Sequence, residues 1–214
     1  MAYIFVNVNR SVGTINPNIY GQFSEHLGRC IYQGIYVGEN AEIPNINGMR
    51  CDVVNALKAL HIPVLRWPGG NFAGEFNWMD GLLPADMRAP FQSYLGLETQ
   101  PHTMGYDFSE MNTDDFIALC REIGAEPFIT INPCWNTPDE NAAWVEYCNG
   151  DVSTPYGKLR ANRGHQEPYN VQFWSLGNEF GYGHMEGANT PAGYCQIALE
   201  NGKKMLEASP GLSL

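Results

Sequence analysis

Short apolar runs alternate with helix-length segments along this chain, and this alternation limits the possible folds more than any other feature. Runs of strand length occupy residues 19–23, 62–66, 127–131 and 170–176. The segments between them carry apolar residues at helical spacing, as residues 51–60 and 113–123 do. Strands that alternate with helices form a parallel sheet, so we expect an α/β protein.

Three of the expected helices begin at recognisable capping residues. Asn112 is followed by two acidic residues in the expected first turn, where the helix dipole favours negative charge. Thr137 and Thr190 each precede a proline, which fits the first position of a helix. We interpret residues 151–168 as a polar connection and residues 212–214 as the opening of a further strand.

The unusual polar residues of the chain lie where the expected strands end. They are Glu25, His26, Arg66, Asn71, Asn132, Asn178 and Glu179. Function in a (β/α)₈ barrel lies at the carboxyl ends of the strands. The first expected strand also lacks the glycine-rich phosphate fingerprint of a dinucleotide-binding fold. The pattern therefore favours a barrel.

A complete barrel needs eight strand–helix units in about 250 residues, whereas this chain of 214 residues supplies four. We therefore expect residues 16–214 to form the N-terminal half of a (β/α)₈ TIM barrel. Residues 1–15 contain an alternating segment, from Tyr3 to Val8, that we interpret as a half-buried leading strand. A C-terminal half, or a second copy of the chain, is then expected to complete the barrel.

The charge balance excludes some classes of partner. The chain has 12 Lys+Arg against 23 Asp+Glu, a net charge of −11, so we expect no nucleic acid and no membrane surface as partner. We find no membrane-length apolar run and no signal peptide, and expect a cytoplasmic protein. The six cysteines lack zinc-binding spacing and are interpreted as reduced thiols, so no metal site is expected.

Glu179 is the main candidate for acid–base chemistry. The segment 174–179 is an apolar strand that ends in an amide and a carboxyl group, and Gly177 permits both side chains to face one pocket. A carboxyl group walled by aromatic rings is protonated more readily, which suits a general acid near neutral pH. The alternative is a loop glutamate that caps the next helix.

Two other strand ends carry candidate binding residues. Arg66 can hold a carboxylate such as Glu179 through a charge-assisted hydrogen bond, and the turn after it directs Asn71 into the site. Glu25 can accept hydrogen bonds from two sugar hydroxyls. The alternatives are a plain turn with a stacked tryptophan for residues 66–71, and a surface carboxylate for Glu25.

Three spaced segments resemble the α-L-arabinofuranosidases of glycoside hydrolase family 51. They are Ile19–Arg29, Arg66–Phe72 with Asn77–Gly81, and Trp174–Glu179. Together with Gly124–Pro127 they follow the family's order, and the resemblance covers nearly the whole chain. It implies a (β/α)₈ catalytic barrel with an accessory β-sandwich beside it, to which residues 1–15 would belong.

The resemblance also implies a role for each candidate residue. Glu179 is the implied catalytic acid/base, and Asn178 is implied to bind O2 of the sugar. Glu25 and Asn71 are the implied ligands of the other furanose hydroxyls, and Arg66 is implied to position the carboxylates. The family's nucleophile is a second glutamate at the end of the seventh strand, beyond the last residue of this chain.

The implied activity is retaining hydrolysis of terminal α-L-arabinofuranosyl residues from hemicellulose-derived oligosaccharides. The implied partner is an arabinose-containing oligosaccharide or polysaccharide, and we expect a homo-oligomer and no cofactor. Two alternatives stay open: an endo-β-1,4-glucanase or xylanase on the same scaffold, and a non-catalytic carbohydrate-binding half-barrel. Residues 132–136 and 91–99 depart from the family pattern on expected rim loops, so the preference for the leaving group stays open.

Overall fold

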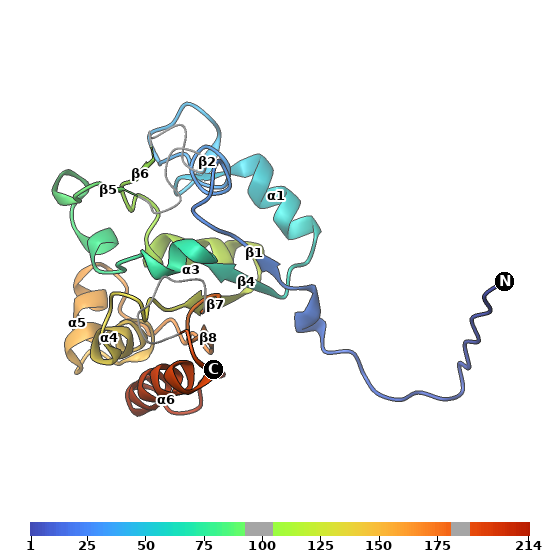
Figure 1. Cartoon of the computed structure of the whole chain (residues 1–214). Coiled ribbons are helices and arrows are strands. Elements are labelled where there is room, and N and C mark those ends of the chain that lie inside the picture. Colours follow the sequence, from blue (N-terminus) through green and yellow to red (C-terminus); the bar gives the residue numbers. More distant parts are fainter. Residues whose placement is uncertain (93–104, 181–188) are drawn as a thin grey trace.

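A four-stranded parallel sheet forms the centre of the molecule (Figure 1). The computed structural model describes residues 1–92, 105–180 and 189–214. The strands lie in the order β1 (Gln22–Phe23), β4 (Val64–Trp67), β7 (Glu126–Thr130) and β8 (Phe173–Ser175). Ser213 forms a further parallel bridge with Phe173, so the expected strand opening at residues 212–214 lies beside β8.

Helices occupy the segments between these strands and after the last of them. In the described part of the chain they are α1 (Cys51–Ala59), α3 (Thr113–Ile123), α4 (Pro138–Asn149), α5 (Pro155–Asn162) and α6 (Pro191–Ala208). No helix among the described residues combines the length and apolar character needed to cross a membrane. Among the described residues, two antiparallel strand pairs lie outside this sheet: β2 (Asn45–Ile46) with β3 (Met49–Arg50), and β5 (Phe91–Gln92) with β6 (Tyr106–Asp107). Short 3₁₀ helices span Pro17–Tyr20, Asn71–Gly74, Asp80–Leu82 and Ala85–Met87.

The predicted capping residues begin α3, α4 and α6. Asn112 forms a capping box with Asp115, and Thr137 forms a second one with Glu140. Gly124 ends α3 with φ at 76°, a left-handed conformation that glycine adopts without strain. These local signals therefore fixed the helix boundaries correctly.

Helix α5 corrects the interpretation of residues 151–168 as a polar connection. Thr154 caps this helix, since its Oγ1 accepts a hydrogen bond from the Gly157 N–H at 3.1 Å, and Pro155 occupies the first position. The same threonine–proline signal begins α4 and α6. The segment has few apolar residues, and a reading based on apolar spacing overlooks such a helix.

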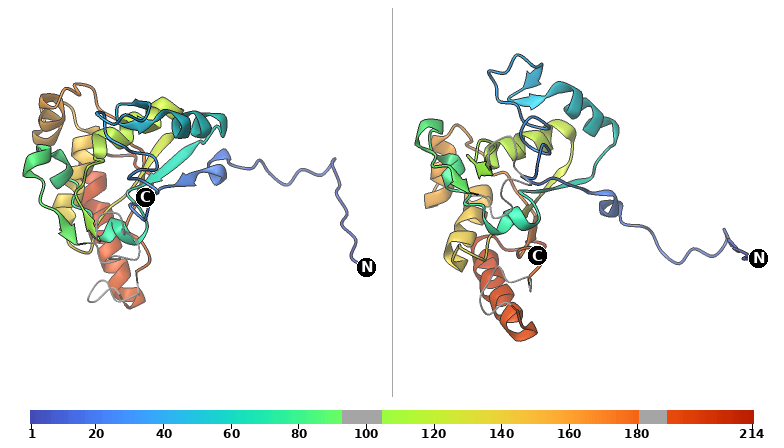
Figure 2. Two further views of the ribbon diagram at one scale, coloured as in Figure 1. Left: turned by 90° about the horizontal axis from the view of Figure 1, so that it is seen from above. Right: turned by 45° about the horizontal axis from the view of Figure 1, so that its top comes forward.

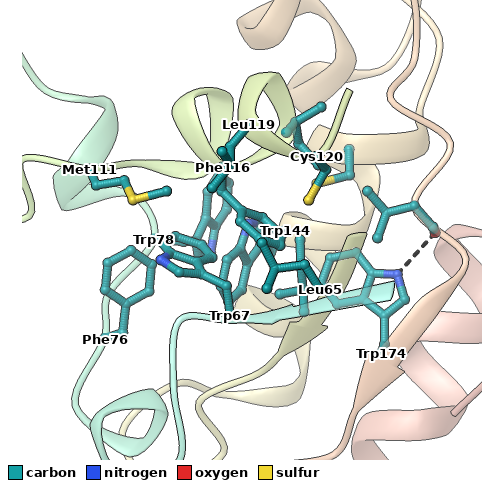
Figure 3. Close-up of a cluster of buried hydrophobic side chains, with 14 of the residues drawn as sticks. Leu65, Trp67, Phe76, Trp78, Met111, Phe116, Leu119, Cys120, Trp144 and Trp174 are labelled. Atoms are coloured by element: carbon teal, nitrogen blue, oxygen red, sulfur yellow. Dashed lines mark hydrogen bonds between the residues drawn. The ribbon is translucent and has the colours of Figure 1, made fainter. Parts of the chain in front are cut away.

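Four fully buried tryptophans form the centre of the core (Figure 3). They are Trp67, Trp78, Trp144 and Trp174. Trp67 of β4 stacks on Phe116 of α3, with ring centroids 5.0 Å apart, and Trp144 of α4 packs edge-on against Trp174 of β8 at 5.8 Å. Each of the four indole N–H groups donates a hydrogen bond, as a buried indole requires. The sheet and the helices are therefore held together by rings with fixed orientations.

The opposite face of the sheet carries side chains that are exposed or only partly buried. Phe23, Arg66, Phe128 and Phe173 stand at one level across the strands, because each is in register with the next. Phe23 is 49% exposed, and Phe128 contacts Phe173 edge-on. Successive side chains of a strand point to opposite faces, so Arg66 lies on this face while Trp67 enters the core.

Residues 1–15 extend away from the rest of the molecule (Figure 1, Figure 2). All of them are exposed, including Phe5 at 94%. The half-buried strand expected from Tyr3 to Val8 is not formed in this structure. A strand needs a neighbour for its backbone hydrogen bonds, and this segment contacts no sheet edge among the described residues.

Candidate active site

The carboxyl ends of the four parallel strands bring the predicted polar residues together. β1 leads to Glu25, β4 contains Arg66 and leads to Asn71, and β8 leads to Asn178. Arg66 and Asn178 are hydrogen-bonded although they are 112 positions apart in the sequence. The clustering predicted from strand ends is therefore present for these four residues.

Glu25 is buried, at 8% exposure, and the turn after β4 holds it in place. Its Oε1 accepts hydrogen bonds from the N–H groups of Gly70 at 2.9 Å and Phe72 at 3.1 Å. A Cβ atom on Gly69 would lie 2.6 Å from Glu25 Cγ, so glycine is needed there for the carboxylate to keep its place. The two amide donors fix one carboxylate oxygen and thereby orient the other. Burial excludes the alternative of a surface carboxylate.

Arg66 joins three strands on the partly buried face of the sheet. Its Nε donates to Thr130 Oγ1 at 2.8 Å and its Nη2 to Asn178 Oδ1 at 2.9 Å, and the guanidinium carbon lies 5.1 Å from the centre of the Phe23 ring. The expected partner Glu179 is not among these hydrogen-bond acceptors. Asn178, one residue earlier, occupies the guanidinium edge instead, which corrects that expectation.

Asn178 connects two of the strand ends. Its Oδ1 accepts from Arg66, and its Nδ2 donates to Asn71 Oδ1 at 3.2 Å. Gly70 lies between Glu25 and Asn178, because a Cβ there would be 3.3 Å from Glu25 Oε1 and 3.4 Å from Asn178 Nδ2. An amide has two donor protons and two acceptor lone pairs, so Asn71 and Asn178 keep hydrogen-bonding capacity for a ligand.

Glu179 stands on a turn with unusual backbone geometry. Gly177 has φ at 109° and Glu179 has φ at 45°. A Cβ on Gly177 would lie 2.4 Å from the Phe180 ring, so this position requires glycine. A non-glycine residue with positive φ is uncommon, and such residues cluster at functional sites.

The surroundings of Glu179 differ from those expected. Its side chain is exposed, whereas an aromatic pocket was expected around it. Trp174 lies in the core instead, because side chains alternate between the two faces of β8. The tryptophan of the predicted aromatic wall therefore lies on the other face of the sheet from Arg66.

The ionisable groups of the cluster act on one another. Burial lowers the pKa of Arg66, and the negative charges of Glu25 and Glu179 oppose that change. Glu179 therefore shares the electrostatic environment of the cluster without a direct hydrogen bond to the guanidinium group.

The described residues hold no group of three or more histidine, cysteine, aspartate or glutamate side chains arranged to bind a metal. His61 is exposed, and His165 lies 4.0 Å from Asp114. His102 and His184 lie outside the described residues.

Asn132 lies at a strand end but stabilises the loop that follows it. It is 1% exposed, accepts hydrogen bonds from the N–H groups of Cys134 and Trp135 at 3.1 and 3.2 Å, and donates to the Phe76 carbonyl at 3.2 Å. Trp135 is 78% exposed on this loop. In the other segment that departs from the family pattern, residues 93–99 lie outside the described part of the chain.

The sequence analysis missed Thr130, and it placed Gly69, Gly70 and His26 at the strand ends without predicting their contacts with Glu25 and Asp107. Thr130 receives a hydrogen bond from the guanidinium group, and Gly69 and Gly70 provide the space and one donor for the buried carboxylate. His26 is buried beside that carboxylate and contacts Asp107. A hydroxyl residue at the end of a predicted strand, and an ionisable residue next to a candidate carboxylate, were the available signals.

Comparison with known proteins identifies the family. The model of the alpha-L-arabinofuranosidase 1 domain matches residues 56–191. The chain is 42% identical over 213 residues to the probable alpha-L-arabinofuranosidase C of Aspergillus fumigatus, covering 99% of this chain and 40% of that protein. It is also 42% identical over 179 residues to an intracellular exo-alpha-L-arabinofuranosidase of Bacteroides ovatus, covering 83% of this chain and 34% of the relative. The chain thus spans at most about 40% of the length of these relatives.

Solved structures agree with the sequence comparison. The alpha-L-arabinofuranosidase of Thermotoga maritima, in complex with arabinose, is similar with a TM-score of 0.82 and 43% identity, over 91% of this chain and 39% of that one. A family 51 alpha-L-arabinofuranosidase from Bifidobacterium longum is similar with a TM-score of 0.85 and 30% identity, over 97% of this chain and 40% of that one. The parallel α/β sheet fits the corresponding part of these enzymes, and the chain therefore belongs to the α-L-arabinofuranosidases of glycoside hydrolase family 51.

Proposed function

We propose that the full-length protein is a retaining glycoside hydrolase that removes terminal α-L-arabinofuranosyl residues from hemicellulose-derived oligosaccharides. The observation that carries this proposal is the hydrogen-bonded cluster of Arg66, Asn178 and Asn71 beside the buried Glu25. A few fixed polar groups at one place are what recognition of a small ligand requires, and a sugar offers hydroxyls to all of them. The names of the relatives favour this activity over an endo-β-1,4-glucanase or xylanase and over a non-catalytic binding module.

Each residue of the cluster has a role in the proposed reaction. Glu25 accepts hydrogen bonds from furanose hydroxyls through the carboxylate that Gly70 orients. Asn71 binds a second part of the ring, and Asn178 binds the hydroxyl next to the reacting carbon. Arg66 holds Asn178 in place and keeps positive charge close to the carboxylates.

Glu179 is the proposed acid/base. It donates a proton to the glycosidic oxygen as the bond to the anomeric carbon breaks, while a second carboxylate attacks that carbon and forms a glycosyl-enzyme. Glu179, now ionised, then takes a proton from water, which displaces the enzyme carboxylate and releases arabinose. A retaining enzyme needs its two carboxyl groups about 5–5.5 Å apart. We propose that the second one comes from a strand of the full-length barrel outside residues 1–214.

The same proposal extends to the architecture. Residues 16–214 form the first four strand–helix units of a (β/α)₈ barrel, and the bridge between Ser213 and Phe173 supports a further strand beside β8. Residues 1–15, whose apolar side chains are exposed here, supply a strand to an accessory β-sandwich.

We also propose where the protein acts and with what. The substrate is an arabinose-containing oligosaccharide or polysaccharide, and the location is cytoplasmic, which the name of the intracellular Bacteroides relative supports. The full-length protein is proposed to be a homo-oligomer.

The role of Glu179 is tested with Glu179→Ala in the full-length gene product. Turnover should fall most on aryl α-L-arabinofuranosides with poor leaving groups, because only those need protonation by the acid. Added azide should restore part of the activity, since it attacks the glycosyl-enzyme without a general base. Glu42→Ala, a matched change at an exposed glutamate, should behave like the unmodified enzyme. Equal losses on good and poor leaving groups, with no azide effect, would remove Glu179 from this role.

A further inference from the structure

His26 is a buried ionisable residue that the proposed mechanism does not use. It directly follows Glu25, and neither its side chain nor that of its partner Asp107 is exposed to solvent. Its Nδ1 lies 3.2 Å from Asp107 Oδ2, and its Nε2 lies 3.0 Å from Trp67 Nε1. Both ring nitrogens therefore have a partner of known hydrogen-bonding character.

The partners determine where the proton of His26 resides. The indole N–H of Trp67 is only a donor, so Nε2 of His26 has to accept with its lone pair. The single proton of the neutral ring is then on Nδ1, from which it is donated to Asp107. In an imidazolium ring, Nε2 would also carry a proton and would face the indole N–H, and two donors cannot form a hydrogen bond with each other.

The Asp107 carboxyl group also accepts hydrogen bonds from groups other than His26. Its Oδ1 accepts from the Tyr32 hydroxyl at 3.0 Å and from the Ser109 N–H at 2.7 Å. Three hydrogen bonds, from the His26 ring, the Tyr32 hydroxyl and the Ser109 N–H, favour the ionised form of this buried carboxyl group. An ionised Asp107 is an acceptor only, which is what the Nδ1–H tautomer needs.

The ring of His26 also lies against the turn that holds Glu25. It stacks on the Phe72 ring with centroids 4.4 Å apart and an interplanar angle of 1°. The Phe72 N–H is one of the two donors to Glu25 Oε1, and Phe72 directly follows Asn71. The His26 N–H donates to the Pro68 carbonyl at 3.1 Å, which ties the same two segments together.

We propose that His26 is a positioning residue for sugar binding: its neutral Nδ1–H tautomer, fixed between Asp107 and Trp67, holds the Phe72 ring and so the turn that orients Glu25 and Asn71. The tautomer assignment stands on the described contacts alone. The effect on catalysis rests on the proposed function.

The tautomer is measured directly by ¹⁵N NMR of the histidine side chains in the full-length protein. The His26 signals are those lost in His26→Asn, and they should show a protonated Nδ1 and an unprotonated Nε2 at neutral pH. Asp107→Asn should move the proton partly to Nε2, as happens when the aspartate that orients a histidine is replaced by its amide. A ring protonated on Nε2 in the unmodified protein would overturn the assignment.

The positioning effect is measured by kinetics and by the ¹³C signal of the Glu25 carboxyl group. In His26→Ala, kcat/KM for aryl α-L-arabinofuranosides should fall about 10- to 100-fold, the effect of moving a positioning group by about 1 Å. The fall should be the same for good and poor leaving groups, unlike that of Glu179→Ala. His26→Asn, which keeps an N–H donor for Asp107, should lose less. The Glu25 signal should shift in His26→Ala.

His61→Asn is the matched control, because His61 is an exposed histidine that is not part of the cluster around Glu25. It should leave the kinetics and the Glu25 signal unchanged. A folded His26→Ala protein with kcat/KM within twofold of normal and an unshifted Glu25 signal would overturn the proposal. If the unmodified enzyme hydrolyses no arabinofuranoside, the proposed function fails. The two NMR measurements then still decide on the role of His26.

Discussion

Gly69 is in contact with the side chain of Glu25, and the space it leaves determines where that carboxylate stands. The Cβ of any other residue would lie 2.6 Å from Glu25 Cγ and 3.0 Å from Oε1. The atoms that would have to move belong to the glutamate side chain and not to the backbone. A substitution here is therefore expected to displace the carboxylate that we propose binds the sugar, while the fold is kept.

Gly69→Ala should lower kcat/KM for aryl α-L-arabinofuranosides by about 10- to 100-fold, because the carboxylate no longer matches the sugar hydroxyls. The midpoint of thermal unfolding should change little. Gly13→Ala is the control, since a Cβ at Gly13 meets no atom within 4 Å. Normal kinetics in Gly69→Ala would show that Glu25 is not held where the reaction needs it.

For single residues, the sequence predicted which of them lie together better than it predicted where their side chains point. Glu25, Asn71 and Asn178 cluster as expected, because parallel strands end at one edge of the sheet. The hydrogen-bond partner of Arg66 and the exposure of Glu179 were not predictable. Both depend on the φ angles of the turn after β8, which no residue pattern specifies.

Helix α3 begins with two buried or half-buried carboxylates that have different partners. Asp114 accepts hydrogen bonds from Tyr147 of α4 at 2.6 Å, from Tyr169 at 2.8 Å and from Arg163 at 2.8 Å. Burial of the tyrosines, and then the negative charge of Asp114, raise the pKa of both hydroxyls. Asp115 instead accepts only a backbone hydrogen bond among those described, from the Asn112 N–H at 3.0 Å.

Burial raises the pKa of Asp115 to about 6, from an ordinary value of 3.8. The folded state therefore holds this proton more tightly than the unfolded state. The free energy of unfolding should fall as pH rises through the window from about 4 to 6, by at most about 3 kcal/mol from this group. Asp115→Asn keeps an acceptor for the Asn112 N–H and removes the charge. The free energy of unfolding of the variant, relative to that of the unmodified protein, should therefore be higher at pH 7 than at pH 4.

Urea unfolding followed by tryptophan fluorescence at pH 4 and pH 7 measures this difference, because the buried tryptophans report on the same core. Asp139→Asn, at an exposed aspartate in the first turn of α4, is the control and should show no comparable gain. A stability difference for Asp115→Asn that is the same at both pH values would contradict the account.

The sequence predicted helix starts better than it predicted the first strand, because a cap depends on nearby residues and a strand depends on a neighbouring strand. Capping residues gave the starts of α3, α4 and α6, because a cap is satisfied within four residues. The same signal was present for α5 but was outweighed by the polar composition of its segment. The strand expected from Tyr3 to Val8 could not be judged from its pattern, because a strand forms only beside a partner.

The molecule as a whole leaves two apolar surfaces uncovered. One is the face of the sheet that carries Phe23, Phe128 and Phe173. The other is a groove of about 640 Å³ beside α6 and the end of β8, lined mainly by Leu176, Leu199, Leu206 and Leu214. Both adjoin the edge at which Ser213 pairs with Phe173. Further strands and helices of the proposed barrel would cover these surfaces and bring the second carboxylate to the cluster.

The configuration of the first product shows whether this cluster belongs to a retaining α-L-arabinofuranosidase. The full-length enzyme is mixed with an aryl α-L-arabinofuranoside, and ¹H NMR follows the anomeric signals before mutarotation. We predict that the α-anomer of arabinofuranose appears first, because two displacements restore the original configuration. Initial formation of the β-anomer would show a single displacement, with carboxyl groups about 6.5–9.5 Å apart, and would exclude the proposed retaining mechanism.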